Sequence, residues 1–218
     1  MPAAVYIASA LLAYLLGSIP TGFLVAKAKG VDIRSVGSGN IGATNVFRFL
    51  GKGAGLFVLF ADALKGWLGV RAAVWMAQAL LAPDSMERGT VWAEIIAGFM
   101  AIIGHNYTCW LYFRGGKGIA TSAGVLTALV PIPLLIILGV WIVVFALSRY
   151  VSLASISAAF VLPFATWIFA QRAELIIATA AMTTLAIYKH KANIQRLIAG
   201  TENRIGFKKT PQAAKPTQ

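Results

Sequence analysis

Charged residues are scarce in this chain, and acidic ones are the scarcest. Of its 218 residues only 12% are charged, and 7 are Asp or Glu against 19 Lys or Arg. A soluble domain carries about 25% charged residues, so this composition argues against a soluble protein. The few acids are not clustered, which also argues against a metal-dependent phosphotransferase that needs several aspartates in one motif.

The chain has one cysteine, Cys109, so an internal disulfide is excluded. We expect it to be a buried packing residue, the usual state of a free cysteine. No cleavable signal peptide is expected, because the first apolar segment lacks a basic region before it. No internal repeat is evident, although many secondary transporters contain one.

Long apolar runs occupy most of the remaining sequence. Hydrophobic residues make up 59% of the chain, which is typical of a polytopic membrane protein. The run 119–147 exceeds the roughly 20 residues that cross a bilayer, and Pro131 and Pro133 interrupt it. We predict two short helices there with a turn at 130–133, and one kinked helix is the alternative. The other predicted spans are 4–26, 53–81, 90–113, 151–170 and 175–188, with polar loops at 83–89 and 171–174.

The positions of the basic residues predict how the chain crosses the membrane. With seven spans and the N-terminus outside, the loops after the odd-numbered spans and the tail hold 15 of the 19 basic residues. Basic residues gather in cytoplasmic loops, whereas merging the fourth and fifth spans would put Arg149 and the basic tail outside. We therefore expect an all-α membrane protein with about seven transmembrane helices and a cytoplasmic C-terminus. Residues 1–207 should form one domain and 208–218 a disordered tail. The basic loops suit anionic lipid headgroups, and nucleic acid is not an expected partner.

The stretch from Gly37 to Arg48, GSGNIGATNVFR, is small, polar and glycine-rich, yet it lies between two apolar spans. Backbone N–H groups exposed by glycine, together with an arginine, form binding sites for phosphate. The glycines at 37, 39 and 42 also match the dinucleotide fingerprint, but that motif needs a preceding strand, and here the flanks are helical. The tetrad GGKG at 115–118 is not a Walker A loop, because Leu111 stands where that motif needs its first glycine.

Further polar segments fall on the same predicted side of the membrane. A substrate with a lipid tail and a phosphate would fit a groove among them, with its head near Lys, Arg and Asn. The segments are GHNY, RGGKG, SRYVSLAS and KHKANIQRLIAGTENR.

These segments resemble the acyl-phosphate:glycerol-3-phosphate acyltransferases of bacteria, the PlsY family. The motifs GSGNIGATNVFR, FRGGKG and NIQRLIAGTE carry the resemblance, which extends from Leu16 to Glu202. It implies an enzyme of the cytoplasmic (inner) membrane that moves a fatty acyl group from acyl phosphate to the 1-hydroxyl of glycerol 3-phosphate. The products would be lysophosphatidic acid and phosphate, the first step of phospholipid synthesis. The resemblance implies no metal, CoA or other cofactor, and a partner enzyme that supplies acyl phosphate. The His-x4-Asp pair of other glycerol phosphate acyltransferases is missing, since neither His105 nor His190 has Asp five residues on.

The resemblance also implies a set of site residues. The catalytic residues would be Lys117, Arg48 and His190. The residues expected to bind substrate are Ser38, Asn40, Thr44, Asn45, Arg48, Gly116, Lys117, Ser155, His190 and Asn193. Those expected to support the site are Gly37, Gly39, Gly42, Gly115, Gly118 and Glu202.

Structural roles are the alternatives for these residues. The polar residues of the first motif could cap the helix of the second span. Lys117 could be an interfacial anchor, His190 a cation at headgroup level, and Ser155 a contact between helices. Glu202 could simply pair with the basic residues around it.

Three polar residues near or within the spans are expected to be structural. Asp62 and Lys65 are three residues apart on one helix and can pair, so each neutralises the other. His105 lies near the membrane face with no clear partner in the sequence. Intramembrane charges are functional suspects by default, so a role in the site stays open for all three.

Two groups could accept the proton of the attacking hydroxyl: His190, whose usual pKa is in a useful range, or a phosphate oxygen of the substrate. We favour the substrate oxygen. The chain has no Ser-His-Asp set, which argues against an acyl-enzyme. The rival function is a membrane transporter of a phosphorylated metabolite, which predicts a site near the midplane. A purely structural membrane protein would not need several glycine-rich polar segments.

Overall fold

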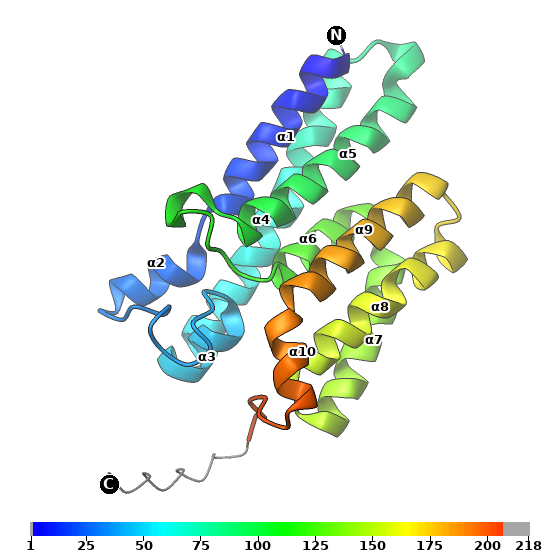
Figure 1. The fold of residues 1–218 in the computed structure, drawn as a ribbon. Helices are drawn as coiled ribbons and strands as arrows, with labels where there is room; N and C mark the ends of the chain where they lie inside the picture. Colours follow the sequence, from blue (N-terminus) through cyan, green and yellow to red (C-terminus); the bar gives the residue numbers. More distant parts are fainter. Residues whose placement is uncertain (1, 207–218) are drawn as a thin grey trace, which may run out of the picture.

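The computed structural model describes residues 2–206, in which the regular secondary structure is helical throughout. The helices are α1 (Pro2–Ser18), α2 (Thr21–Ala28), α3 (Ala43–Leu50), α4 (Lys52–Leu80), α5 (Pro83–Asn106), the 3-10 helix η1 (Cys109–Leu111), α6 (Ile119–Leu129), α7 (Pro131–Ser148), α8 (Val151–Phe169), α9 (Ala173–Lys189) and α10 (Lys191–Ile198). In Figure 1, α1, α4 and α5 lie side by side, as do α7, α8 and α9, and α6 packs on α4. Phe207 and the tail predicted to be disordered, 208–218, lie outside the described residues.

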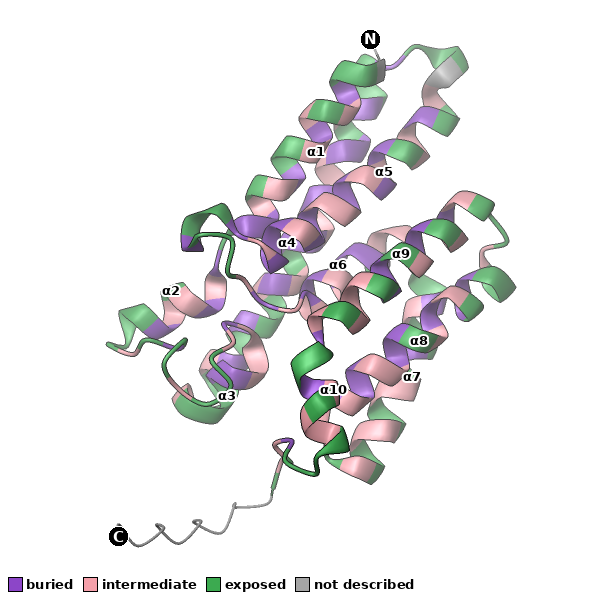
Figure 2. Ribbon diagram, in the orientation of Figure 1, coloured by how far each residue is buried: buried purple, intermediate pink, exposed green. Residues whose placement is uncertain are grey.

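Four segments are long and apolar enough to cross a membrane: Ala3–Ala28, Lys52–Leu80, Pro131–Ser148 and Val151–Phe169. Exposed residues lie on the outer faces of the helices (Figure 2). Many of them are large and apolar, for example Phe60 at 68%. A soluble monomer rarely leaves so much apolar surface in water, whereas a lipid environment suits it. The predicted all-α membrane fold is confirmed, and the count of seven spans stays a prediction.

The predicted break at the prolines is confirmed. Helix α6 ends at Leu129, Val130 lies between the helices, and α7 begins at Pro131. Proline suits the first turn of a helix, where its missing N–H would have no partner. The long apolar run is therefore two helices, as the length argument requires.

Two other boundaries differ from the prediction. The first predicted span is divided at Ile19 and Pro20, between α1 and α2, because proline cannot continue the hydrogen-bond ladder and restricts the residue before it. The predicted polar loop 83–89 is instead the start of α5, with Pro83 in its first turn. Hydropathy locates apolar runs but does not show where a helix begins.

The third predicted span, 90–113, ends as a helix at Asn106. The chain beyond it forms the short η1 turn, in which Tyr112 and Phe113 adopt positive φ angles of 53° and 61°. The prediction for Cys109 is wrong, because its side chain is exposed on this turn rather than packed inside. The irregular segment returns the chain to the end of α5, where it leads into α6.

Close packing of α4 on α6 depends on glycine on both sides. A Cβ atom on Gly66 would lie 2.3 Å from the carbonyl oxygen of Thr121, and one on Gly124 would lie 1.8 Å from that of Ala63. Small residues allow membrane helices to approach this closely, which increases their van der Waals contact. This contact joins the N-terminal helices to the C-terminal ones.

Candidate active site

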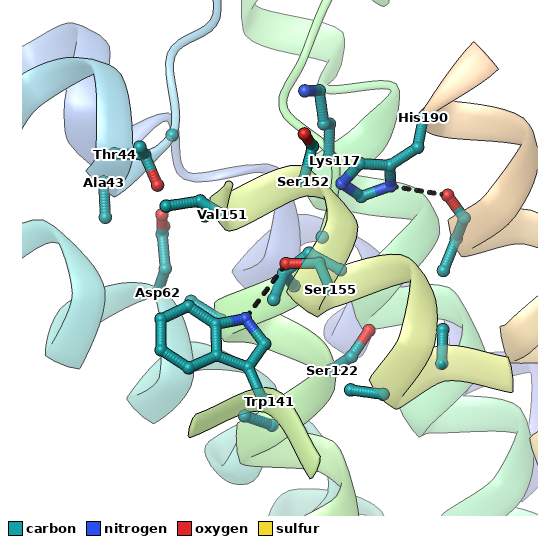
Figure 3. A pocket seen from close by; sticks show the side chains of 18 of the residues that line it. Ala43, Thr44, Asp62, Lys117, Ser122, Trp141, Val151, Ser152, Ser155 and His190 are labelled. Carbon is teal, nitrogen blue, oxygen red and sulfur yellow. Dashed lines mark hydrogen bonds between the residues drawn. The ribbon is translucent and has the colours of Figure 1, made fainter. Parts of the chain in front are cut away.

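One cavity of about 350 Å³ is lined by residues of α3 to α10, of the loop before α3, and of the segments before α6 and after α10. One part of its lining is polar and basic, and the other is apolar. Figure 3 shows Lys117, Ser152 and His190 close together, with Trp141 and Ser122 farther along the cavity. The polar lining includes Ser38, Asn40, Thr44, Asn45, Arg48, Lys117, His190, Asn193 and Glu202, and the apolar lining includes Leu59, Leu126, Leu134, Ile137, Leu138, Leu162 and Met182.

The loop before α3 is folded around the amide of Asn45, which is buried. Its Nδ2 donates to the carbonyl oxygens of Ile33 at 3.1 Å and Val36 at 3.0 Å, and its Oδ1 accepts from the N–H of Ser38 at 3.2 Å. The amide of Asn45 is thus used in shaping the loop. Asn40 has a similar part, because its Oδ1 accepts from the N–H of Gly42 at 2.8 Å.

The alternative in which this motif caps the helix of the second span is wrong. That helix, α4, begins after Gly51, and no side chain caps it. The motif instead bends back on itself at Gly37 and Gly39, whose φ angles of 59° and 66° favour glycine. Arg48, on α3, lines the cavity, where burial lowers its pKa and the charge of Glu202 opposes that shift.

The tetrad 115–118 is tied to the end of α5. The N–H groups of Gly115 and Gly116 donate to the carbonyl oxygens of Asn106, at 3.2 Å, and His105, at 3.0 Å. Lys117 follows and donates to the Oδ1 of Asn193. Burial lowers the pKa of Lys117 to about 8, with Glu202 opposing this shift and neighbouring arginines adding to it.

Glu202 connects α8 and α10 at the polar end of the cavity. Its Oε1 accepts from Ser152 Oγ at 3.0 Å and Asn193 Nδ2 at 2.8 Å, and its Oε2 pairs with Arg196 Nε at 2.7 Å. Although burial raises the pKa of Glu202, these hydrogen bonds hold it below the usual value. Because Asn193 also accepts from Lys117, the glutamate orients that lysine indirectly.

His190 lies between α9 and α10 and is buried. Its Nδ1 is 2.8 Å from the carbonyl oxygen of Ala186 (Figure 3), and a carbonyl can only accept, so Nδ1 carries the hydrogen. Burial lowers the pKa of His190 to about 4, and the charge of Lys117 adds to this shift. The ring is therefore neutral at pH 7, and its Nε2 is left as an acceptor.

Similarity to known proteins agrees with this combination of a basic end and an apolar end. The family model described as glycerol-3-phosphate acyltransferase matches residues 7–200. The chain belongs to the glycerol-3-phosphate acyltransferase family. Curated glycerol-3-phosphate acyltransferases of Geotalea daltonii and Thermosynechococcus vestitus are 46% and 44% identical to it. These alignments cover 88% and 90% of this chain and 93% of each relative.

Solved structures agree with the family assignment. The crystal structure of PlsY, an integral membrane glycerol 3-phosphate acyltransferase, in its glycerol 3-phosphate form matches with a TM-score of 0.83 and 38% identity. This match covers 92% of this chain and 96% of that one. The lysophosphatidic acid form matches with a TM-score of 0.80 and 37% identity, over 92% and 95% of the two chains. The resemblance to the PlsY family is confirmed, and this acyltransferase is a membrane protein of phospholipid synthesis.

Most residues that the sequence singled out in this acyltransferase meet at the cavity. Of the expected substrate ligands, Gly116 alone is not part of the lining, and among the supporting residues Gly37, Gly39 and Gly115 lie outside it. Ser155 lines the cavity and accepts from Trp141 Nε1 at 3.2 Å (Figure 3), so its own O–H can still donate. Among the described residues, no group of three His, Cys, Asp or Glu side chains could hold a metal ion.

Sequence reasoning assigned no site role to several residues that line the cavity. Ser152 lies three residues before Ser155, on the same face of α8, and that spacing was a usable signal. Trp141 gave no such signal, because the run around it is uniformly apolar. His105, predicted to have no clear partner, has its Nδ1 3.7 Å from Asp62 Oδ1, beyond hydrogen-bond distance. The predicted pair of Asp62 and Lys65 is present at 2.7 Å.

Proposed function

We propose that this acyltransferase moves a fatty acyl group from acyl phosphate to the 1-hydroxyl of glycerol 3-phosphate, giving lysophosphatidic acid and phosphate. The observation that supports this reaction is the continuity of one cavity with a basic end and an apolar end. A phosphate head and a hydrocarbon tail need these two environments within one molecule's reach. Phosphate suits Arg48, whose planar fork donates two parallel hydrogen bonds, and Lys117, which acts as a point charge.

The apolar end offers an acyl chain a wall of apolar side chains. On α7 this wall consists of Leu134, Ile137, Leu138 and Trp141. At 1.5 Å per residue, Leu134 and Trp141 are about 10 Å apart along the helix axis. Leu126, Leu162 and Met182 of the neighbouring helices continue the apolar lining, along which part of a fatty acyl tail would lie.

In the proposed reaction the hydroxyl oxygen of glycerol 3-phosphate attacks the carbonyl carbon of acyl phosphate. A C–O bond forms to the glycerol oxygen, the C–O bond to phosphate breaks, and the hydroxyl proton passes to a phosphate oxygen. Arg48 and Lys117 offset the repulsion between two anions and stabilise the charge that develops on the leaving phosphate. Ser38 and Arg48 hold glycerol 3-phosphate, and Thr44, Ser155 and the glycine-rich backbones contribute hydrogen bonds and positioning.

His190 is a weak candidate for the base. Its lowered pKa of about 4 means that the neutral ring takes up a proton poorly at pH 7. Its Nε2 can still accept a hydrogen bond from a substrate hydroxyl and orient it. We therefore assign His190 to binding and orientation, and the proton transfer to the substrate's own phosphate.

Seven spans with the N-terminus outside would place the basic end of the cavity at the cytoplasmic face of the inner membrane. Soluble glycerol 3-phosphate would reach the site from that side, and an enzyme that makes acyl phosphate would deliver the donor from the same side. The bias of basic residues toward this face supports the arrangement.

The test uses purified protein with palmitoyl phosphate and glycerol 3-phosphate, without metal or CoA. Phosphate release and lysophosphatidic acid are followed together. We expect equal amounts of both, and a loss of about 10²–10³-fold in kcat/KM for Lys117→Ala. Lys29→Ala, at an exposed site on the C-terminal side of α2, is the matched control and should keep full activity. Uptake of glycerol 3-phosphate into sealed vesicles without any lysophosphatidic acid would support the transporter instead.

A further inference from the structure

A buried ionic cluster adjoins the tetrad 115–118, and although two of its members, Asp62 and His105, line the cavity, the proposed reaction does not use them. Asp62 and Lys65 on α4 and His105 at the end of α5 have side chains 2%, 7% and 5% exposed. Asp62 Oδ1 lies 2.7 Å from Lys65 Nζ and 3.7 Å from His105 Nδ1. Burying three ionisable groups is costly, and each needs a partner, so the cluster must hold a fixed geometry.

His105 contacts the tetrad through both its backbone and its ring. Its carbonyl oxygen accepts from the N–H of Gly116 at 3.0 Å. A Cβ atom on Gly116 would lie only 2.1 Å from His105 Nε2, so the imidazole fills the place of a side chain at position 116. The ring therefore supports the backbone at Gly116, from which Lys117 extends.

The other ring nitrogen lies 3.7 Å from Asp62 Oδ1, beyond hydrogen-bond distance, so the carboxylate is beside the imidazole without bonding to it. The cluster is in turn tied to the break between α1 and α2, because Lys65 Nζ donates to the carbonyl oxygen of Ile19 at 2.7 Å. A rigid platform built from α4, α5 and this break thus supports a loop that has few packing side chains of its own.

We propose that His105, packed against Gly116, is a positioning residue for Lys117. The imidazole holds the backbone at Gly116, and this places the Lys117 ammonium at the basic end of the cavity. The proposal rests on the proposed function, in which Lys117 contacts a phosphate. A cluster that served stability alone would not need an imidazole in contact with the Cα of Gly116.

A pair of nearly isosteric variants tests the ring contact. The amide of Gln can reach the position of Nε2 beneath Gly116, whereas the amide of Asn reaches only the position of Nδ1 beside Asp62. We expect His105→Gln to stay within about threefold of wild-type kcat/KM. His105→Asn and His105→Ala should lose about tenfold or more, because small misplacements of a catalytic group cost up to 10²-fold. Equal losses for His105→Gln and His105→Asn would overturn the proposal, and thermal melting of all variants reports whether each is folded.

The dependence of kcat/KM on pH tests the proposal further. A merely structural role for His105 would leave this profile unchanged. Burial lowers the pKa of Lys117 to about 8, Glu202 opposes this shift, and Arg196, Arg48 and Lys189 add to it, so we expect the alkaline limb of kcat/KM near pH 8. If the tetrad loses its support, Lys117 becomes more hydrated and the limb moves toward the usual lysine value of 10.5. We expect this upward shift in His105→Asn but not in His105→Gln. An unshifted limb in His105→Asn would overturn the proposal.

Two glycines of the tetrad supply a matched steric control. Gly116→Ala collides with the His105 ring, whereas Gly115→Ala collides with the His105 carbonyl oxygen at 2.0 Å. Removing the ring in His105→Ala should therefore recover part of the activity lost in Gly116→Ala and none of that lost in Gly115→Ala. Equal behaviour of the two double variants would overturn the ring contact. If wild-type protein makes no lysophosphatidic acid, or Lys117→Ala keeps full activity, the proposed function fails instead.

Discussion

Lys117 is half-buried among other cations, and this gives the proposed reaction a pH limit. Its pKa is lowered from 10.5 to about 8, so the ammonium form dominates below pH 8 and is lost above it. The cation is the form that attracts phosphate. We therefore expect kcat/KM to fall about tenfold between pH 7 and pH 9. Phosphate monoesters keep their second charge over this range, so the substrate itself does not change.

The matched variant for this prediction is Lys117→Arg, whose guanidinium stays protonated throughout. It should be slower than wild type at pH 7, because a fork replaces a point charge, but its profile should be flat to pH 9. A decline near pH 8 that persists in Lys117→Arg would assign the limb to another group.

His190 gives a second prediction at the scale of a single residue. His190→Gln should keep kcat within about threefold of wild type and raise the KM for glycerol 3-phosphate about tenfold, because a hydrogen bond to the substrate is lost and no base is removed. Steady-state kinetics with both substrates varied checks this outcome. A loss of 10²–10⁴-fold in kcat would reinstate His190 as the general base.

The residue types of the site were predictable from the sequence, but the role of each residue in the site was not. The motif from Gly37 to Arg48 is recognisable because several small and polar residues share one turn. Nothing in the sequence shows that the amide of Asn45 is used up by the backbone of Ile33 and Val36, contacts that depend on how the loop folds. The contacts of His105 were not predicted for the same reason, since Asp62, which lies beside it, is on another helix.

Among helices, the contact of α4 with α6 gives a prediction about stability. Gly124→Ala should destabilise the protein by about 1–3 kcal/mol, because the new methyl group would collide with the carbonyl oxygen of Ala63. Gly139→Ala on α7 is the control, since no atom lies within 4 Å of its added Cβ. It should be neutral or stabilising by up to about 1 kcal/mol, because alanine favours helix. Thermal melting in one detergent compares them, and equal melting temperatures would contradict the close contact.

The helix boundary that the sequence predicted correctly is one where a proline interrupts a run too long for one span. Pro131 ended a run that was too long for one span, so two helices were predicted there and are present. Pro20 divides the first span just as firmly, but the residues around it stay apolar and the run is of ordinary length. The start of α5 was missed because its first turns are polar, and polarity alone does not separate an exposed helix from a loop.

At the scale of the whole molecule, the single cysteine makes the predicted orientation testable. In a Cys109→Ala background, Lys29→Cys follows the first predicted span and Glu87→Cys follows the second, and both positions are exposed. A membrane-impermeant maleimide should label Glu87→Cys in intact spheroplasts and Lys29→Cys only in inverted vesicles. The reverse pattern would invert the proposed topology, and labelling of both from one side would rule out a membrane crossing between them.

The continuity of the cavity has a consequence for how turnover ends. Glycerol 3-phosphate brings a glycerol phosphate head without a tail, and acyl phosphate brings a tail and a phosphate without glycerol, whereas lysophosphatidic acid carries the tail and the glycerol phosphate head on one molecule. Joining two recognised parts raises affinity because the second contact becomes intramolecular. We therefore expect the cavity to bind lysophosphatidic acid tightly. Release of this lysolipid into the bilayer, rather than bond formation, is then the step most sensitive to the surrounding membrane.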